Sequence, residues 1–252
     1  MHERTHHEPW QKVSLITGAA QRVGEQLARG LHARGYRVIV HYRNSAQQAQ
    51  AIVDDLNKNR PLTAVAIAAD LADATALVQL AADCLKQWGR IDVLINNASS
   101  YYPTPWGEAK LSDWQTLIGS NLMGPFFLTQ ELLPALTAQC GCVVNMIDIF
   151  AERPARDMPI YGMAKAGLAH MTKSLAFDLR GKVRVNGIAP GAILWPEQLM
   201  SSEDKSNMLQ RIPLGEIGDP SDIVRTALFL IEDAPYINGQ IIAVDGGLSL
   251  NT

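Results

Sequence analysis

Short apolar runs alternate with helical segments along most of the chain, and this alternation constrains the fold more than any other feature. The runs expected to form strands are 12–16, 36–41, 63–68, 91–95, 142–147, 183–188 and 240–244. The segments expected to form helices are 25–34, 46–57, 73–88, 111–136, 160–179 and 221–231. Because several runs are apolar on both faces, we predict an α/β fold with a doubly wound parallel sheet flanked by helices. Ligands bind such sheets at the carboxyl ends of the strands.

The length of the chain favours one domain. Its 252 residues are enough for a single large core. We expect a flexible N-terminal leader at 1–11 and one domain at 12–252. Residues 192–211 form the least regular long stretch, and a loop of that length in a compact domain is usually a lid or a binding loop. We therefore expect a substrate loop at about 192–211.

Charge and cysteine content argue against several classes of function. A formal net charge of -3 predicts no basic surface for nucleic acid. No apolar run reaches the length of a membrane span, and the N-terminus lacks the apolar core of a signal peptide. The odd set of Cys84, Cys140 and Cys142 fits a reduced, cytoplasmic compartment. The histidines of the leader favour a disordered tail over a metal site, so no metal is expected.

A glycine-containing turn follows the first expected strand and leads into the first helix. Gly18 and Gly24 bound this turn, and Arg22 lies within it. Strand, turn and helix in this order suit a pyrophosphate, because glycines let the backbone approach it and a helix N-terminus favours its negative charge. Arg22 adds a cation where a phosphate would lie. Two glycines in a turn are also common without any nucleotide.

The end of the second expected strand bears on the choice of cofactor. Sites that prefer NAD usually place an acid about 20 residues beyond the turn. Here the segment consists of His41, Tyr42, Arg43, Asn44 and Ser45. A cation with a hydroxyl suits a 2′-phosphate, so we predict NADPH. The alternative is that Arg43 is an ordinary solvated loop arginine.

Tyr161 and Lys165 are four residues apart and share one face of the expected helix at 160–179. Asp148 lies at the end of the preceding strand. A phenol pKa of about 10 must fall by about 3 units to exchange a proton near neutrality, and one ammonium about 4 Å away supplies about that much. Lys165 is placed to do this. The alternative is a tyrosine and a lysine on an ordinary surface helix.

The long helix expected at 111–136 has poor helix formers at its centre, at 119–121 and 124–125. One interpretation is a kink at Asn121, where a freed backbone group holds a water. The other is a weak helix rescued by packing.

In combination and order, these features resemble the short-chain dehydrogenase/reductase family from about residue 12 to 248. The matching positions are Thr17-Gly18, Asp70, Asn96-Asn97-Ala98, Asn121, Tyr161, Lys165, Asn186 and Pro190-Gly191. The resemblance implies a single-domain Rossmann-type fold, a nicotinamide cofactor and usually a homotetramer. It also implies that Tyr161 is the acid/base, that Lys165 lowers its pKa and holds the nicotinamide ribose, and that Asn121 keeps a proton-relay water.

Two departures from the ordinary family pattern resemble the pteridine reductases. The middle glycine of the first turn is Arg22, and the serine expected thirteen residues before Tyr161 is Asp148. The segments 96–105 and 41–45 are also similar to that subgroup. In the subgroup, an aromatic ring at the position of Tyr101 stacks on the pterin, while Ser99 and Arg22 contact pterin and cofactor phosphate. The alternative for Tyr101 is that it merely packs a loop.

The resemblance, carried over residue by residue, implies three overlapping sets of site residues. The catalytic set is Asp148, Tyr161, Lys165 and Asn121. The substrate set is Arg22, Ser99, Tyr101, Asp148 and Tyr161. The cofactor set is Gly18, Arg22, Val23, Gly24, His41, Tyr42, Arg43, Asn44, Ser45, Asp70, Leu71, Asn97, Ala98, Ser99, Tyr161, Lys165, Pro190 and Gly191.

These sets predict NADPH-dependent reduction of a small-molecule pterin, such as dihydrobiopterin, dihydromonapterin or dihydrofolate. Hydride would pass to a C=N bond, with Tyr161 as proton donor. The alternative is a short-chain reductase of another small carbonyl or 3-oxoacyl compound. A third hypothesis is a catalytically idle binding protein of the same fold, and the presence of Asn121, Tyr161 and Lys165 argues against it.

Overall fold

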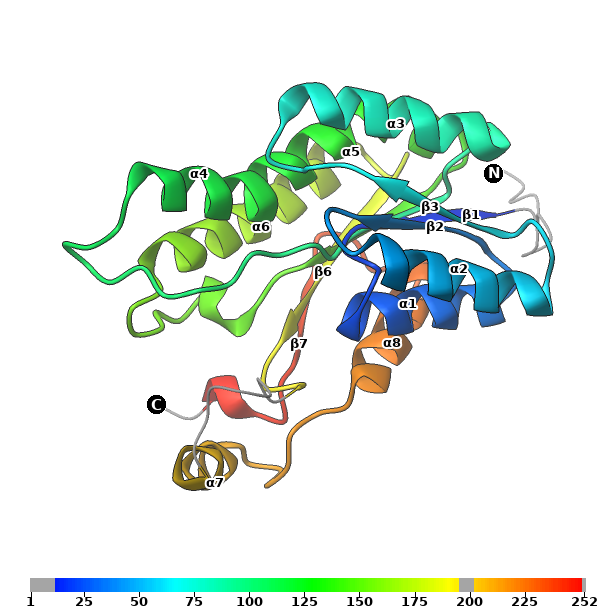
Figure 1. Ribbon diagram of the computed structural model, residues 1–252. Helices are drawn as coiled ribbons and strands as arrows, with labels where there is room; N and C mark the ends of the chain where they lie inside the picture. The colour runs from blue at the N-terminus through cyan, green and yellow to red at the C-terminus, as the bar shows by residue number, and fades with distance from the viewer. Residues whose placement is uncertain (1–11, 195–201, 251–252) are drawn as a thin grey trace.

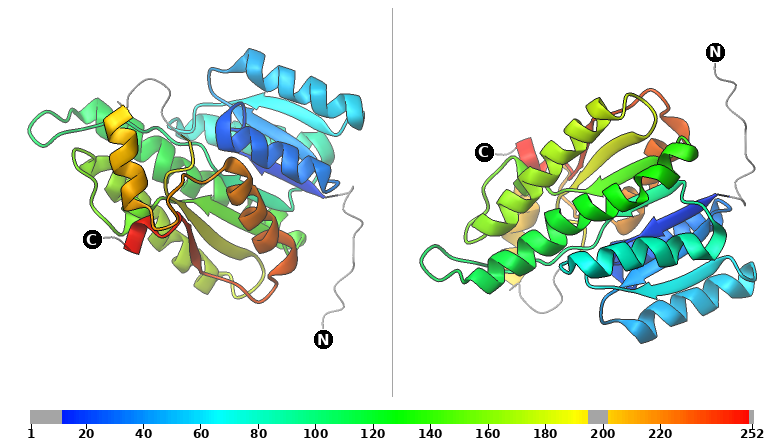
Figure 2. Two further views of the ribbon diagram at one scale, coloured as in Figure 1. Left: turned by 90° about the horizontal axis from the view of Figure 1, so that it is seen from below. Right: turned by 90° about the horizontal axis from the view of Figure 1, so that it is seen from above.

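The computed structural model describes residues 12–194 and 202–250 (Figure 1). The expected leader at 1–11 and residues 195–201 of the expected substrate loop lie outside the described residues. The described chain forms one α/β domain in which a central sheet lies between two layers of helices (Figures 1 and 2).

Within the described residues, seven strands form one parallel sheet in the order β3-β2-β1-β4-β5-β6-β7. The strands are β1 (Val13–Ile16), β2 (Arg37–Tyr42), β3 (Ala64–Ala68), β4 (Val93–Asn96), β5 (Cys142–Met146), β6 (Arg184–Pro190) and β7 (Ile241–Val244). The strand order reverses between β1 and β4, which creates a crevice at their carboxyl ends. The predicted doubly wound parallel sheet is confirmed.

Two groups of helices cover the two faces of this sheet (Figures 1 and 2). One face carries α1 (Arg22–Ala33), α2 (Ala46–Asn59) and α8 (Pro220–Leu228), and the other carries α3 (Ala74–Trp88), α5 (Gly124–Ala138) and α6 (Pro159–Asp178). Alternate residues of β1 divide between the two cores, as the pleat requires: Val13 and Leu15 face one, and Ile16 the other. No helix among the described residues is both long and apolar enough to cross a bilayer.

The segment predicted as one helix at 111–136 is two helices. α4 (Leu111–Ile118) and α5 are joined by a π-helical turn at Gly119–Met123. Added Cβ atoms at Gly119 and Gly124 would lie 2.7 Å from Ala72 Cβ and 2.8 Å from Leu71 Cβ, so glycine permits a close approach of the chain after β3. The helix is thus interrupted at Asn121 by a π turn, which agrees with the first of the two interpretations in the place of the irregularity.

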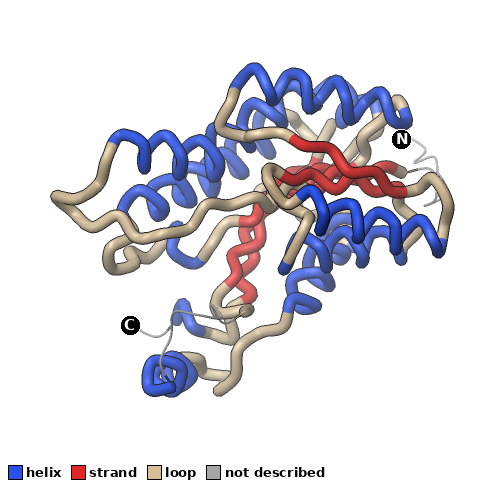
Figure 3. The backbone as a smooth tube through the Cα atoms, viewed as in Figure 1, coloured by secondary structure: helices blue, strands red, loops and turns tan. Residues whose placement is uncertain are grey.

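The prediction of an irregular loop up to residue 211 is wrong in its second half, because α7 (Ser202–Arg211) is helical (Figure 3). Met208 and Ile212 are four residues apart and join a small core cluster with Ile147 and Leu168. The three apolar residues Met208, Leu209 and Ile212 at the end of an otherwise polar segment give too weak a periodic signal to predict a helix.

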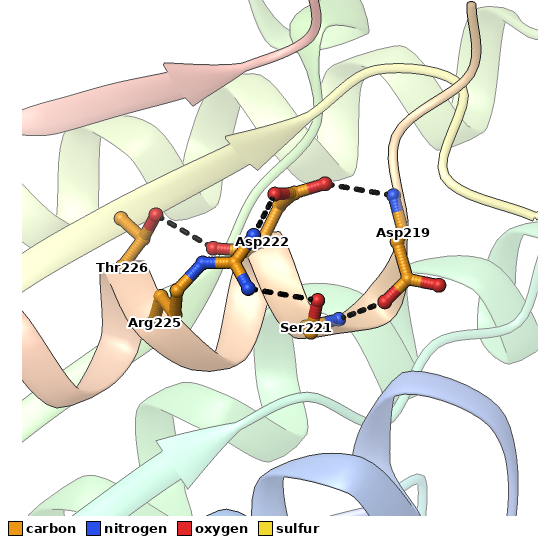
Figure 4. A network of polar contacts seen from close by, with 5 residues as sticks. All are labelled: Asp219, Ser221, Asp222, Arg225 and Thr226. Carbon is orange, nitrogen blue, oxygen red and sulfur yellow. Dashed lines mark hydrogen bonds and ion pairs between the residues drawn. The ribbon is translucent and has the colours of Figure 1, made fainter.

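The start of α8 is fixed by a compact polar network (Figure 4). The Asp219 side chain accepts the Ser221 N–H at 2.8 Å, and the Asp222 side chain accepts the Asp219 N–H at 2.8 Å. This capping box satisfies backbone donors that a helix leaves unpaired at its first turn. Arg225 donates to Ser221 Oγ at 3.1 Å and pairs with the Asp222 carboxylate. The network therefore sets where α8 begins beside α1.

Candidate active site

The predicted catalytic residues meet just beyond the carboxyl end of β5. Asp148 follows that strand, and Tyr161 lies in the first turn of α6. The Tyr161 hydroxyl donates to Asp148 Oδ2 at 2.7 Å, and Asp148 Oδ1 accepts the Phe150 N–H at 2.9 Å. Both oxygens of the carboxylate are therefore engaged, one by the backbone and one by the phenol.

Lys165 lies deep beneath this pair, with 2% of its surface exposed. Its Nζ donates to the Met146 carbonyl at 2.8 Å and lies 5.6 Å from the centre of the Tyr161 ring. The neighbouring strand residue, Asn145, donates to Thr172 Oγ1 at 2.9 Å. Consecutive residues of β5 thus bind residues seven apart on α6, which fixes the position of the helix along the strand.

Burial dominates the electrostatics of this group. It raises the pKa of Asp148, and it lowers the pKa of Lys165 to about 8. The pKa of Tyr161 is raised, first by burial and second by the charge of Asp148. The expected net fall in the phenol pKa is therefore wrong, because desolvation and a neighbouring carboxylate both oppose the phenolate.

Asn121 is fully buried in the π turn, and both ends of its amide are bonded. Its Nδ2 donates to the carbonyls of Ser100 and Leu117, each at 2.9 Å. Its Oδ1 accepts the Ser99 hydroxyl at 2.7 Å. The Ser99 side chain is also near enough to Tyr161 to lower its pKa, against the larger effects of burial and Asp148. Asn121 thus joins the site through Ser99.

Tyr101 lies beside the catalytic tyrosine and keeps 55% of its surface exposed. Its ring and that of Tyr161 meet edge to face, with centres 4.9 Å apart. The structure therefore brings together Ser99, Tyr101, Asp148 and Tyr161 of the predicted substrate set. The fifth member, Arg22, belongs to the β1–α1 turn.

The β1–α1 turn and the end of β4 form one hydrogen-bonded unit. Thr17 Oγ1 accepts the N–H groups of Asn97 and Ala98 at 2.9 and 3.0 Å. Asn97 Nδ2 in return donates to the carbonyls of Thr17 and Gly18 at 2.9 and 3.1 Å. A Cβ on Gly18 would lie 2.8 Å from Ala98 Cα, and one on Gly24 would lie 2.3 Å from the Gly18 oxygen. Only glycine fits these two positions without movement of the backbone.

Arg22 is exposed and begins α1 with a φ of 55°. A side chain in this left-handed region is uncommon and costs about 1–3 kcal/mol, and glycine would avoid that cost. Its neighbour Val23 is half-buried. Arg22 therefore sits under local strain at the position where a nucleotide phosphate is predicted.

The ring of His41, a member of the predicted cofactor set, points into the protein. It is buried, its Nδ1 accepts the Gly18 N–H at 3.1 Å, and its Nε2 lies 3.1 Å from the Ala69 carbonyl. Because Nδ1 accepts, the ring proton lies on Nε2 and is donated to Ala69. Burial lowers the pKa of His41 to about 4, so the ring is neutral at pH 7. His41 supports the glycine turn from inside the fold.

The other predicted cofactor residues lie at the carboxyl ends of the strands. Arg43 and Asn44 are exposed just after β2, Tyr42 is half-buried, and Ser45 is the N-cap of α2. Asp70 accepts the Ala72 N–H at 2.9 Å beside the buried Leu71. Pro190 ends β6, and a Cβ on the following Gly191 would lie 2.6 Å from Asp245 Cβ.

Several contributors to the site were missed because they act through the backbone or from within the core. The Phe150 N–H and the carbonyls of Ser100 and Leu117 leave no mark on the sequence. Thr172 looks like an ordinary buried threonine. Thr17 was named with Gly18 as a position that matches the family, but not as a residue of the site.

Comparison with known proteins identifies a family and several relatives to which this chain is similar. The family described as "Enoyl-(Acyl carrier protein) reductase" matches residues 18–249. Pteridine reductase 1 of Leishmania tarentolae is 34% identical over 96% of this chain and 98% of the relative. The 3-oxoacyl-(acyl-carrier-protein) reductases of Staphylococcus aureus (strain Mu50) and Synechocystis sp. are 34% and 35% identical, over 94% of this chain and 98% and 96% of the relatives. Identity alone therefore does not separate the two classes of substrate.

Proposed function

Because the chain belongs to the short-chain dehydrogenase/reductase family, whose reductases use NAD(P)H, we propose that it reduces a dihydropterin with NADPH. The observation that carries this proposal is the 2.7 Å hydrogen bond between Tyr161 and Asp148. Reduction of a C=N bond ends with a proton on the ring nitrogen. A buried carboxyl bonded to the donor phenol suits that task better than the ordinary hydroxyl that assists at a carbonyl oxygen.

The β1–α1 turn fits the dinucleotide that the proposal requires. Gly18 and Gly24 have no side chain at positions where a Cβ would collide with neighbouring backbone atoms, and the turn leads into the N-terminus of α1. A phosphate can approach such a turn closely. Bound NADPH would supply the hydride.

Proton delivery falls to Asp148 and Tyr161. Burial raises the pKa of Asp148, so that this carboxyl holds a proton at higher pH than a solvated one. Tyr161 keeps its proton because its own pKa is raised. Tyr161 can therefore donate to the substrate nitrogen and be reloaded from Asp148, as a coupled pair. Lys165, bonded to the Met146 carbonyl, is proposed to hold the nicotinamide ribose.

Tyr101 is proposed to stack on the pterin. A pterin is a flat polar bicycle, and an aromatic face opposite the nicotinamide gives it contact area on both sides. The exposure of Tyr101 and its 4.9 Å approach to Tyr161 support this role over the packing of a loop.

A panel of substrates tests the proposed reaction. We expect NADPH oxidation with dihydrobiopterin, dihydromonapterin or dihydrofolate, and little with simple ketones or a 3-oxoacyl thioester. The 3-oxoacyl reductases match the chain equally well, so that reaction is the second candidate. Activity confined to ketones or the thioester would reject the pterin proposal in its favour.

The Arg43→Ala variant tests the preference for NADPH over NADH. Arg43 is exposed where a ribose-binding acid would otherwise stand. Loss of charge-assisted bonds to a 2′-phosphate, worth about 1.5–3 kcal/mol, should lower kcat/KM for NADPH about 10- to 100-fold. The value for NADH should change little. Arg34→Ala, at the far end of α1, is the control. Equal losses with both cofactors would contradict the assignment.

We also propose self-association, the homotetramer expected from the family, through the face of α4, α5 and α6. A groove of about 550 Å³ on that face is lined by Leu122, Phe126, Phe127, Met171 and Leu175, among others. Phe126 and Phe127 are exposed, and apolar surface of this kind marks interfaces. Phe126→Glu should lower the mass measured by light scattering, whereas Val78→Glu on α3 should not. A wild-type monomer would contradict the proposal.

The proposed compartment is the cytoplasm. All three cysteines, Cys84, Cys140 and Cys142, are free thiols, as a reduced compartment favours.

A further inference from the structure

The orientation of the Asn121 amide is fixed by its surroundings. Its nitrogen faces two carbonyl oxygens, those of Ser100 and Leu117, each at 2.9 Å. A reversed amide would turn its oxygen toward two acceptors. Oδ1 therefore has to face Ser99, and at 2.7 Å it takes the proton of the Ser99 hydroxyl.

That proton cannot easily turn toward a ligand. A serine hydroxyl has one proton and two lone pairs. Asn121 is fully buried, so its Oδ1 would lose a partner in a place where water cannot replace it. Leaving a buried acceptor unpaired disfavours the rotated state by about 5- to 150-fold. Ser99, which is exposed, thus offers lone pairs to a ligand.

The neighbouring groups determine which side chains around Ser99 donate hydrogen bonds and which accept them. The Tyr161 proton is donated to Asp148 Oδ2. Ser99 is near enough to influence the pKa of the same phenol, and its own proton is held by Asn121. Ser99 therefore presents an acceptor, and Tyr161, which Asp148 can reload with a proton, is the neighbouring donor.

We infer that Asn121 is a positioning residue that holds Ser99 as a hydrogen-bond acceptor, and that this pair selects substrates with an N–H donor beside the reducible bond. The inference rests on the proposed function and narrows its substrate class. An exocyclic amino group turned toward Ser99 satisfies its oxygen, whereas an exocyclic oxygen at the same place does not. A carbonyl oxygen, as in a 3-oxoacyl compound, meets acceptors there and gains one donor only, that of Tyr161.

Three pteridines of one shape test the inference: 2,4-diaminopteridine, pterin (2-amino-4-oxo) and lumazine (2,4-dioxo). Their dissociation constants are measured by calorimetry on the full chain saturated with NADP⁺. We expect affinity to fall about tenfold or more across the series, as an acceptor facing an acceptor replaces a hydrogen bond. In Ser99→Ala, the dissociation constants of the three ligands should differ by about threefold or less. Ser99→Thr, which keeps the hydroxyl, and the neighbouring Ser100→Ala should retain the wild-type span in affinity.

Asn121→Ala separates positioning from a structural role. It frees the Ser99 proton, so lumazine should bind more tightly while 2,4-diaminopteridine changes little. A merely structural defect would weaken all three ligands equally. If Asn121→Ala does not fold, the Ser99 variants still decide. An undiminished span in Ser99→Ala, or no span in the wild type, overturns the inference, even where NADPH oxidation with dihydropterins supports the reaction. Absence of both that oxidation and pteridine binding rejects the proposed function and the inference together.

Discussion

Replacing Asp148 with asparagine should lower kcat about 10²- to 10⁴-fold, the usual contribution of a positioned proton donor. Asparagine keeps the size of the side chain, and its oxygen can still accept the Phe150 N–H that Asp148 accepts at 2.9 Å. It cannot carry a proton to Tyr161. The KM for the substrate should change much less than kcat, because the shape of the site is retained.

The pH profile gives the sharper measurement. The acid form of Asp148 exists below its pKa, which burial raises, so wild-type turnover should decline as the pH rises through that value. A second decline should follow as Lys165 loses its proton near its pKa of about 8. The Asp148→Asn variant should keep only the second decline, the one that follows the loss of the Lys165 proton. Asp157→Asn, the same change at an exposed carboxylate in the same loop, is the control. Near-full turnover with both declines in Asp148→Asn would contradict the proposed role.

Gly24→Ala should destabilise the protein and lower cofactor affinity about a hundredfold, as small misplacements of a binding turn can. Alanine is favoured over glycine within a helix by about 1 kcal/mol. Its Cβ, however, would lie 2.3 Å from the Gly18 oxygen and 2.6 Å from Asn97 Nδ2. Overpacking costs about 1–3 kcal/mol, so the collision outweighs the helical preference.

Thermal unfolding and cofactor titration measure the two effects of Gly24→Ala. A net loss of 1 kcal/mol should lower Tm by about 2–4 °C in a chain of this size. Gly162→Ala in α6 is the control, because its Cβ would meet only the Phe150 oxygen at 3.6 Å, an ordinary contact. That variant should be as stable as the wild type or slightly more so. Equal Tm values for Gly24→Ala and wild type, with unchanged cofactor affinity, would contradict the proposed packing of the turn.

Local pattern was enough to predict the sheet and the ends of its strands, because buried parallel strands are apolar runs with few alternatives. It was also enough to place Asp148 beside Tyr161. It did not reveal that the His41 ring turns inward, because the bonds that hold the ring come from Gly18 and Ala69, which follow the neighbouring strands β1 and β3. It failed at α7, because only the contact of Met208 and Ile212 with the small core cluster shows that the segment has a buried side.

The electrostatics of the site also depend on depth, which a sequence does not state. Lys165 was expected to lower the pKa of Tyr161 as a nearby ammonium. In the fold, burial raises the pKa of Tyr161 and lowers that of Lys165, because it disfavours the charged form of each group. The phenol also donates a hydrogen bond to the Asp148 carboxylate, whose charge raises the phenol pKa further. The link from Asn121 to Ser99 was equally hidden, since it requires the π turn to face the end of β4.

The bonds between Thr17 and Asn97 join residues 80 positions apart, and β1 pairs directly with β4. A ribosome that adds about 5–20 residues per second needs about 4–16 s to make that intervening stretch. Until β4 emerges, β1 has β2 on one side and an unpaired edge on the other, the kind of edge at which nascent chains aggregate. We therefore expect chaperones to bind this chain mainly during that interval. The crevice between the ends of β1 and β4 therefore forms only after residues 93–97 have been made, about 80 positions after Thr17 and Gly18.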